Sequence, residues 1–149
     1  MEAVSFFPKL CTNTSAMTIE KTIEINTAPA KVWRVFTDPA VTKEMGGEYV
    51  SGWEPGSSFG WKGPDGNMYS NGVILELIPE QLLKHSLLEV QDPEILLSVI
   101  TYQLIPHQDA TLLAAKEELN YEVTEEQLRD AIEGWEIALR AVKDLAEKI

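Results

Sequence analysis

The last 26 residues constrain the fold more than any other part of this sequence. Apolar side chains recur at steps of three and four residues from Leu128 to Ala146, which predicts one amphipathic helix. Thr124 and Gln127 have the spacing of a capping box, so we expect the helix to begin there. Its length is about 30 Å at 1.5 Å per residue. Gly134 lies within it, either as a tolerated residue, the interpretation we favour, or because the helix approaches the sheet closely there or leaves room for something beneath it.

The pattern before this helix is that of strands. Residues 18–26 alternate between apolar and polar side chains, and similar runs cover residues 68–78, 82–90, 95–105 and 111–119. Pro106 is expected to end the fourth run, and in the second run we place Tyr69, Val73, Leu75 and Leu77 on one face. The connections are short, as in an antiparallel meander. A strongly bent antiparallel sheet around one long helix would bury both apolar faces, which predicts an α+β fold.

Residues 27–47 predict two short helices between the first strand and the others. Thr27 is a candidate cap for a first helix with Pro29 in its first turn. Asp38 repeats the capping signal for a second helix, which Gly46 and Gly47 can end.

Five of the nine glycines lie in the run "SGWEPGSSFGWKGPDGN", at residues 51–67. A phosphate-binding loop would need a lysine followed by serine or threonine before a helix, but Lys62 is followed by Gly63. The "EPGS" and "GPDG" segments instead match type II and type I turns. We therefore predict a hairpin in which Phe59 and Trp61 share one face.

The charge balance excludes several classes of partner. The chain has 24 acidic and 12 basic residues, a net charge of -12. Such a field repels nucleic acid and anionic membrane surfaces, whereas a neutral or basic partner is tolerated. No window approaches the roughly 20 apolar residues of a membrane span. Cys11 is the only cysteine, which excludes an intramolecular disulfide and suits a reducing compartment, so we expect a cytoplasmic protein.

The length of 149 residues is typical of one domain. Residues 1–16 lack the basic start and apolar stretch of a signal peptide, so we interpret them as a loose leader before a single domain at 17–149. Translation starting at Met17 is an alternative hypothesis.

Several segments together resemble the SRPBCC superfamily. They are "IEINTAPAKVWRVFTDPA", "WEPGSSFGWKG", "GVILELIPEQLLKHS" and "GWEIALRAVKDLAEKI". The branch they are most similar to contains the C-terminal domain of the activator of heat-shock protein 90 ATPase and a small group of self-sacrifice resistance proteins (CalC-like). The resemblance implies a helix-grip fold (START-like, Bet v-like) with a cavity between the curved sheet and the C-terminal helix.

In this superfamily the inward residues of helices and strands line that cavity. Carried over to this sequence, the resemblance implies a lining of Trp33, Phe36, Phe59, Trp61, Tyr69, Leu75, His85, Tyr102, Leu113, Leu128, Trp135 and Leu139.

Two titratable residues, His85 and Glu117, are candidates for a chemical role. His85 shares a strand face with Leu83 and Leu87, where it is either a satisfied core histidine or a group that hydrogen-bonds a ligand or acts as a general base. Glu117 lies by alternation on the core face, and it is either a functional buried carboxylate or part of a solvated strand end. We assign no catalytic residue, metal or cofactor.

Three functions remain open. The first is a module that binds a small lipid-like or aromatic ligand, with a monomer as the expected state. The second is a co-chaperone-like interaction domain with a chaperone partner, and the third is an enzyme of the cyclase or hydrolase kind. The superfamily fold does not choose among them.

Overall fold

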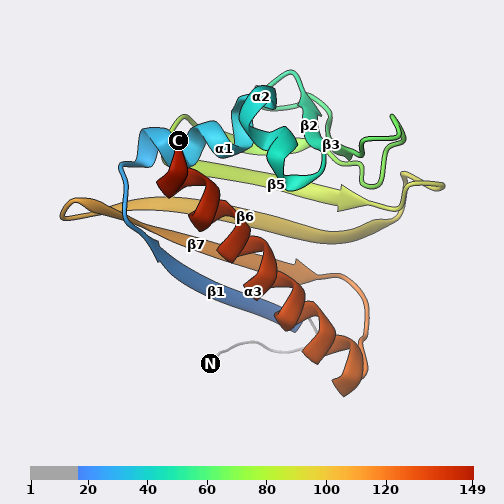
Figure 1. Ribbon diagram of the computed structural model, residues 1–149. Helices are drawn as coiled ribbons and strands as arrows, with labels where there is room; N and C mark the ends of the chain where they lie inside the picture. Colours follow the sequence, from blue (N-terminus) through green and yellow to red (C-terminus); the bar gives the residue numbers. More distant parts are fainter. Residues whose placement is uncertain (1–16) are drawn as a thin grey trace.

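The computed structural model of the protein describes residues 17–149 (Figure 1). The expected loose leader 1–16, with Cys11, lies outside the described residues. The elements in chain order are β1 (Met17–Ile25), α1 (Pro29–Thr37), α2 (Pro39–Thr42), the short 3-10 helix η1 (Lys43–Met45), β2 (Glu48–Ser51), β3 (Phe59–Lys62), β4 (Ile74–Ile78), β5 (Leu82–Leu88), β6 (Leu96–His107), β7 (Ala110–Leu119) and α3 (Glu125–Lys148).

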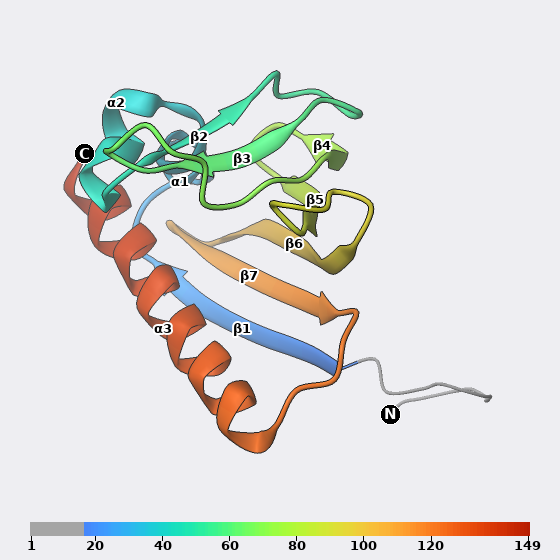
Figure 2. The ribbon, with the colours of Figure 1, turned by 90° about the vertical axis from the view of Figure 1, so that its right-hand side faces the viewer.

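One antiparallel sheet and one long helix form the body of the protein. The strand order is β1-β7-β6-β5-β4, and β2 and β3 pair separately as a hairpin. Figures 1 and 2 show α3 running diagonally across one face of the sheet, which we call the inner face. The predicted α+β helix-grip arrangement, with two short helices after the first strand, is confirmed.

The core lies between the inner face, α1 and α3. Val32 and Val35 of α1 are fully buried, as are Leu83 of β5 and Leu113 of β7. Val142 of α3 belongs to the same buried cluster, so the helix packs against these residues of α1 and the sheet. The apolar alternation of the strands and the apolar side of the helix thus meet in one cluster, as the sequence pattern predicts.

The start of α3 has the predicted capping box. The Gln127 backbone N–H donates to Thr124 Oγ1 at 3.1 Å, and the Thr124 N–H donates to Gln127 Oε1 at 2.9 Å. At Gly134 an added Cβ would meet no atom within 4 Å. The alternative of a close approach to the sheet is therefore wrong, and the exposed position of Gly134 fits the tolerated interpretation.

We expect Thr124→Ala to lower the free energy of unfolding by about 1 kcal/mol, because the substitution removes the hydroxyl oxygen that accepts the Gln127 N–H, while the Thr124 N–H to Gln127 bond can remain. Urea denaturation followed by circular dichroism measures the change. Thr124→Ser keeps the hydroxyl and should stay within a few tenths of a kcal/mol of the parent. Equal losses in the two variants would show that the cap contributes nothing.

One of the two predicted helix caps in the 27–47 segment is wrong. Ala28, not Thr27, is the N-cap of α1, and it makes no side-chain capping bond. Thr27 lies instead in the bend that follows β1, where its carbonyl oxygen accepts a hydrogen bond from the Thr111 hydroxyl. Asp38 does cap α2, since its Oδ1 accepts from the Ala40 N–H at 3.1 Å, and Gly46, with φ of 93°, ends η1.

The glycine-rich run is made of turns, as predicted. Gly56 has φ of 90°, the conformation that the third position of a type II turn requires, and the Ser57 N–H donates to Glu54 across it. Gly66 closes the second turn by donating to the Gly63 carbonyl at 3.0 Å. The hairpin places Tyr49 of β2 opposite Trp61 of β3.

The second predicted strand is wrong in its first half. β4 begins only at Ile74, and its pairing with β5 shifts register between Ile74 and Glu76. This irregularity turns Ile74 into the core, so Leu75 is 44% exposed. Tyr69, before the strand, is 60% exposed. Neither Leu75 nor Tyr69 therefore points inward, contrary to the sequence prediction.

The strand at 95–105 is longer than predicted. β6 continues through Pro106, which pairs with Thr111 of β7. β5 accompanies β6 only as far as Gln103, so Pro106 lies on a stretch with a neighbour on one side alone. Such an edge tolerates a residue without an N–H.

Candidate functional site

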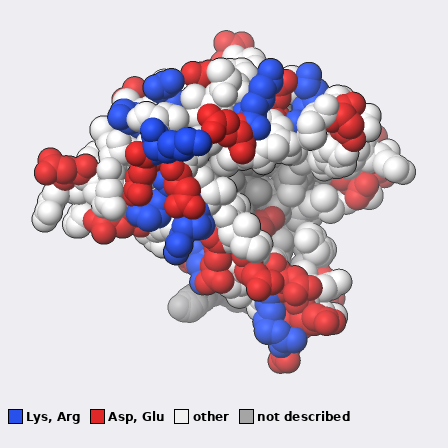
Figure 3. Space-filling view, in the orientation of Figure 1, with Lys and Arg blue, Asp and Glu red and all other residues white. Residues whose placement is uncertain are grey.

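A cavity of about 320 Å³ opens between α3 and the β2–β3 hairpin, over the inner face of the sheet. Figure 3 shows the surface hollowed beside α3, beneath that hairpin. Five of the predicted site residues line it, namely Phe36 of α1, Trp61 of β3, Tyr102 of β6, and Trp135 and Leu139 of α3. Four elements that are distant in sequence therefore contribute to one space.

Six lining residues escaped the sequence analysis. They are Met45, Tyr49, Ile137, Ala138, Ala141 and Val142. Tyr49 could have been found from the hairpin register, because it stands opposite Trp61. Ala138 and Val142 belong to the predicted apolar stripe of α3, and Ile137 and Ala141 flank it. The helical period alone does not tell which part of the stripe, or which flank, faces open space.

The other predicted site residues lie elsewhere. Phe59, His85 and Leu113 are buried in the core, and Trp33 is half-buried against it. Leu128 is half-buried in the first turns of α3, outside the core cluster and the cavity lining.

Aromatic rings make up much of the wall. The Phe36 and Tyr102 ring centroids are 5.0 Å apart, and those of Tyr49 and Trp61 are 4.9 Å apart, edge to face. Tyr102 and Trp135 form a third pair at 5.8 Å, which joins the sheet to α3. Pairs in this range add about 0.5–1.5 kcal/mol beyond the burial of their area, so the wall is a packed unit.

The lining includes two tyrosines, Tyr49 and Tyr102, and the hydroxyl group of each affects the pKa of the other. Desolvation, the largest cause, raises the pKa of Tyr49 to about 12, and it raises the pKa of Tyr102 well above its usual value. Both hydroxyls therefore stay protonated at neutral pH, and each can act as a hydrogen-bond donor or acceptor.

Glu117 connects β7, β6 and α3. Its Oε2 accepts a hydrogen bond from the buried Ser98 hydroxyl at 2.8 Å, and its Oε1 accepts one from the Trp135 indole N–H, also at 2.8 Å. The carboxylate lies on the inner face of the sheet, as the alternation of β7 predicts, and it holds the Trp135 ring in place at the cavity wall. No ion pair joins Glu117 to another residue of the 17–149 segment.

His85 lies beneath the hairpin rather than in the lining. Its Nδ1 is 2.9 Å from the Ser86 carbonyl oxygen, so this nitrogen carries the proton and donates. The imidazole ring packs against Phe59 at 4.4 Å and is 5% exposed. Burial lowers its pKa to about 4, and the Ser86 hydrogen bond opposes this only in part. The side chain is neutral at physiological pH.

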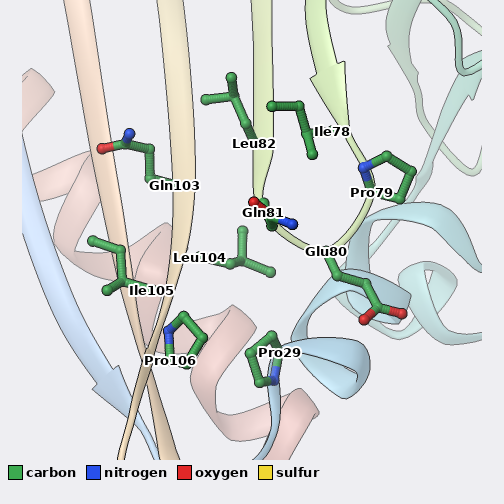
Figure 4. Close-up of a pocket in the computed structure, with 10 residues that line it drawn as sticks. All are labelled: Pro29, Ile78, Pro79, Glu80, Gln81, Leu82, Gln103, Leu104, Ile105 and Pro106. Carbon is green, nitrogen blue, oxygen red and sulfur yellow. The ribbon is translucent and has the colours of Figure 1, made fainter.

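A second, larger hollow of about 520 Å³ lies at the β4–β5 turn and the adjoining part of β6 (Figure 4). Figure 4 shows Pro29 and Pro106 at one end of it and Ile78, Pro79 and Leu82 toward the other. Several of its residues are open to solvent, including Ile78 at 46% and Ile105 at 43%. None of the predicted site residues lines this hollow. The cavity of about 320 Å³, which we call the aromatic cavity, is therefore the stronger candidate site.

Within residues 17–149 no three His, Cys, Asp or Glu side chains gather as a metal site would require. Nor does any helix of this segment combine the length and apolar character needed to cross a bilayer.

The chain matches one known protein family along most of its length. A family model described as "Activator of Hsp90 ATPase homolog 1-like protein" matches residues 26–147. A search of curated proteins finds no match.

Solved structures share the fold over nearly the whole chain. Protein MLL2253 from Mesorhizobium loti is 22% identical, with a TM-score of 0.73, over 89% of this chain and 98% of that one. ChR145 from Cytophaga hutchinsonii is 25% identical, with a TM-score of 0.72, over 91% and 97% of the two chains. The Aha1 dimer from Colwellia psychrerythraea is 19% identical, with a TM-score of 0.71, over 88% and 96%.

Proposed function

This chain belongs to the Activator of Hsp90 ATPase homolog 1-like family, and we propose that it binds a small apolar ligand in its aromatic cavity. The observation that carries the proposal is a space of about 320 Å³ lined by aliphatic and aromatic residues, in which the tyrosines and tryptophans are the residues with polar side-chain atoms that can hydrogen-bond. Such a composition, with few polar groups in a concave apolar wall, is typical of small-molecule sites.

The cavity wall explains how a ligand would be held. Flat or branched apolar groups can pack against the paired rings, and the Tyr49–Tyr102 hydroxyl pair can exchange a hydrogen bond with one polar atom of the ligand. The wall is formed partly by α3 and partly by the hairpin. A ligand in the cavity would therefore contact both elements and fill the space between them.

We expect a matching ligand to raise the thermal stability of the purified protein. At one hundred times its dissociation constant, a ligand adds about 2.7 kcal/mol. For a chain of this size, that is a rise in Tm of roughly 5 to 10 °C. Differential scanning fluorimetry with fatty acids, sterols, flavonoids and polyketide-like aromatic compounds measures the shift.

A matched pair of variants tests the location. Ala138 lines the cavity from an exposed position of α3, so Ala138→Phe can fill the space without disturbing the core. Glu133→Phe adds the same side chain to an exposed site of α3 outside the lining. Loss of the shift in Ala138→Phe but not in Glu133→Phe supports the cavity. A shift that survives in both would place the ligand elsewhere.

One observation favours a second candidate, a co-chaperone-like interaction domain. Ile137 of α3 lies at the rim of the cavity and is 65% exposed, the largest value among the exposed large hydrophobic side chains of the described segment, so a partner that covers the rim would bury it. A chaperone partner would be tested by adding the protein to an Hsp90 ATPase assay, with Ile137→Asp as the variant. Stimulation that Ile137→Asp abolishes would support this candidate, and an unchanged ATPase rate would contradict it.

A further inference from the structure

We infer that the ligand preferred by the aromatic cavity carries a positive charge, as an ammonium group attached to an apolar body. The inference rests on the proposed function, because it names the class of ligand for the same site. Three features of the described residues lead to it: the aromatic lining, the absence of charged side chains from that lining, and the carboxylate bound to one of its rings.

The first feature is the density of aromatic rings. Five of the residues that line this one space are aromatic: Phe36, Tyr49, Trp61, Tyr102 and Trp135. An organic cation within about 6 Å of a ring centroid is attracted by the negative charge on the ring face, and tryptophan attracts most strongly. The rings pair with each other at 4.9 to 5.8 Å, so a small ammonium group can touch more than one of them.

The second feature is the charge at the cavity. No Lys, Arg or His is among the lining residues of the described segment, so an anionic ligand would enter without a counter-charge. The nearby lysines are engaged elsewhere. Lys62 pairs with Glu48 at 3.4 Å and lies with Lys43 in a separate hollow, and Lys148 pairs with Glu44 at 3.1 Å.

The third feature is Glu117. Its carboxylate accepts the Trp135 indole N–H at 2.8 Å, directly behind one wall of the cavity. A hydrogen bond to an anion polarises the donor, which makes the indole ring more negative and strengthens its attraction for a cation. The same negative charge repels an anionic ligand. The net charge of -12 acts in the same direction at longer range.

Three probes that share a phenylpropyl skeleton separate the effect of ligand charge on affinity from the effect of the apolar body. They end in a trimethylammonium, a tert-butyl or a carboxylate group, and isothermal titration calorimetry measures their affinities for the full chain. We expect the ammonium probe to bind about tenfold more tightly than the tert-butyl probe, which has the same shape without charge. The carboxylate probe should bind most weakly of the three.

The outcomes separate this inference from the proposed function. Equal binding of the ammonium and tert-butyl probes keeps the cavity as a site for apolar ligands but overturns the preference for a cation. Tightest binding of the carboxylate probe overturns it as well. If none of the three binds, both the inference and the proposed function fail for ligands of this size. These comparisons use the parent protein and do not depend on a variant that folds.

Glu117→Gln tests the origin of the preference. The amide oxygen can still accept the Trp135 N–H and the amide nitrogen can donate to Ser98, so the ring should keep its position. We expect the ammonium probe to lose about fivefold in affinity and the tert-butyl probe to be unchanged. Glu136→Gln removes the same charge from an exposed site of α3 that pairs with Lys21, and it should change neither affinity. An unchanged ammonium affinity in Glu117→Gln would overturn the role of this carboxylate.

Discussion

Replacing Gly72 by alanine is expected to lower the free energy of unfolding by about 3 kcal/mol. An added Cβ would lie 1.9 Å from the Ser86 carbonyl oxygen and 2.9 Å from its carbonyl carbon. Both atoms belong to the backbone of β5, so the clash cannot be relieved by rotating a side chain. The segment before β4 would have to move away from β5, together with the Gly72 carbonyl that accepts the Phe59 N–H at 2.9 Å.

Gly134→Ala is the control, because at this position replacing glycine by alanine should raise the free energy of unfolding instead of lowering it. No atom lies within 4 Å of the added Cβ, and the residue sits inside α3 at an exposed position. Alanine favours a helix over glycine by about 1 kcal/mol, so the variant should be more stable than the parent. Chemical denaturation of both variants gives the comparison. Equal and small effects would contradict the close approach at Gly72.

Acidification from pH 6.5 to pH 4 is expected to cost about 3 kcal/mol of stability through His85 alone. Burial lowers the pKa of this side chain from 6.5 to about 4 in the folded protein. Above pH 6.5 the imidazole is neutral in both states and adds no pH dependence. Below that value the unfolded chain binds a proton that the folded protein does not, so stability falls until the folded pKa is reached. Below about pH 4 both states are protonated and the loss stops growing.

His85→Leu separates this effect from the titration of carboxylates. The variant should be less stable than the parent at pH 7, because the Ser86 carbonyl loses its donor. Its stability should nevertheless depend less on pH, so the gap between the two proteins narrows as pH falls from 6.5 to 4. Urea unfolding at a series of pH values measures both. A gap that stays constant with pH would show that His85 is not held neutral by burial.

The elements that form through local contacts could be predicted from the sequence. The capping box at Thr124 and Gln127 and the apolar repeat after it located α3 to within a residue or two, because both depend on neighbours within one or two turns. The alternation in β7 placed Leu113 and Glu117 on the inner face for the same reason.

The errors arose where distant segments decide the local structure. Alternation placed Leu75 inward, but the irregular pairing of β4 with β5 turned Ile74 into the core instead. Thr27 has the side chain of a cap, yet it lies in the bend between β1 and α1, where its carbonyl oxygen accepts a hydrogen bond from Thr111. In both cases a pairing partner many residues away overrode a correct local preference.

The sequence by itself determined the order of the elements, the turns of the glycine-rich hairpin and the apolar side of α3. These follow from hydrogen-bonding and steric preferences that act over a few residues. Only the tertiary structure decided that Tyr49 and Trp135 line the same space and that Glu117 holds the Trp135 ring. A cavity is the volume that packed elements leave unfilled, so it depends on distances between α1, the hairpin, the sheet and α3, which no local pattern records.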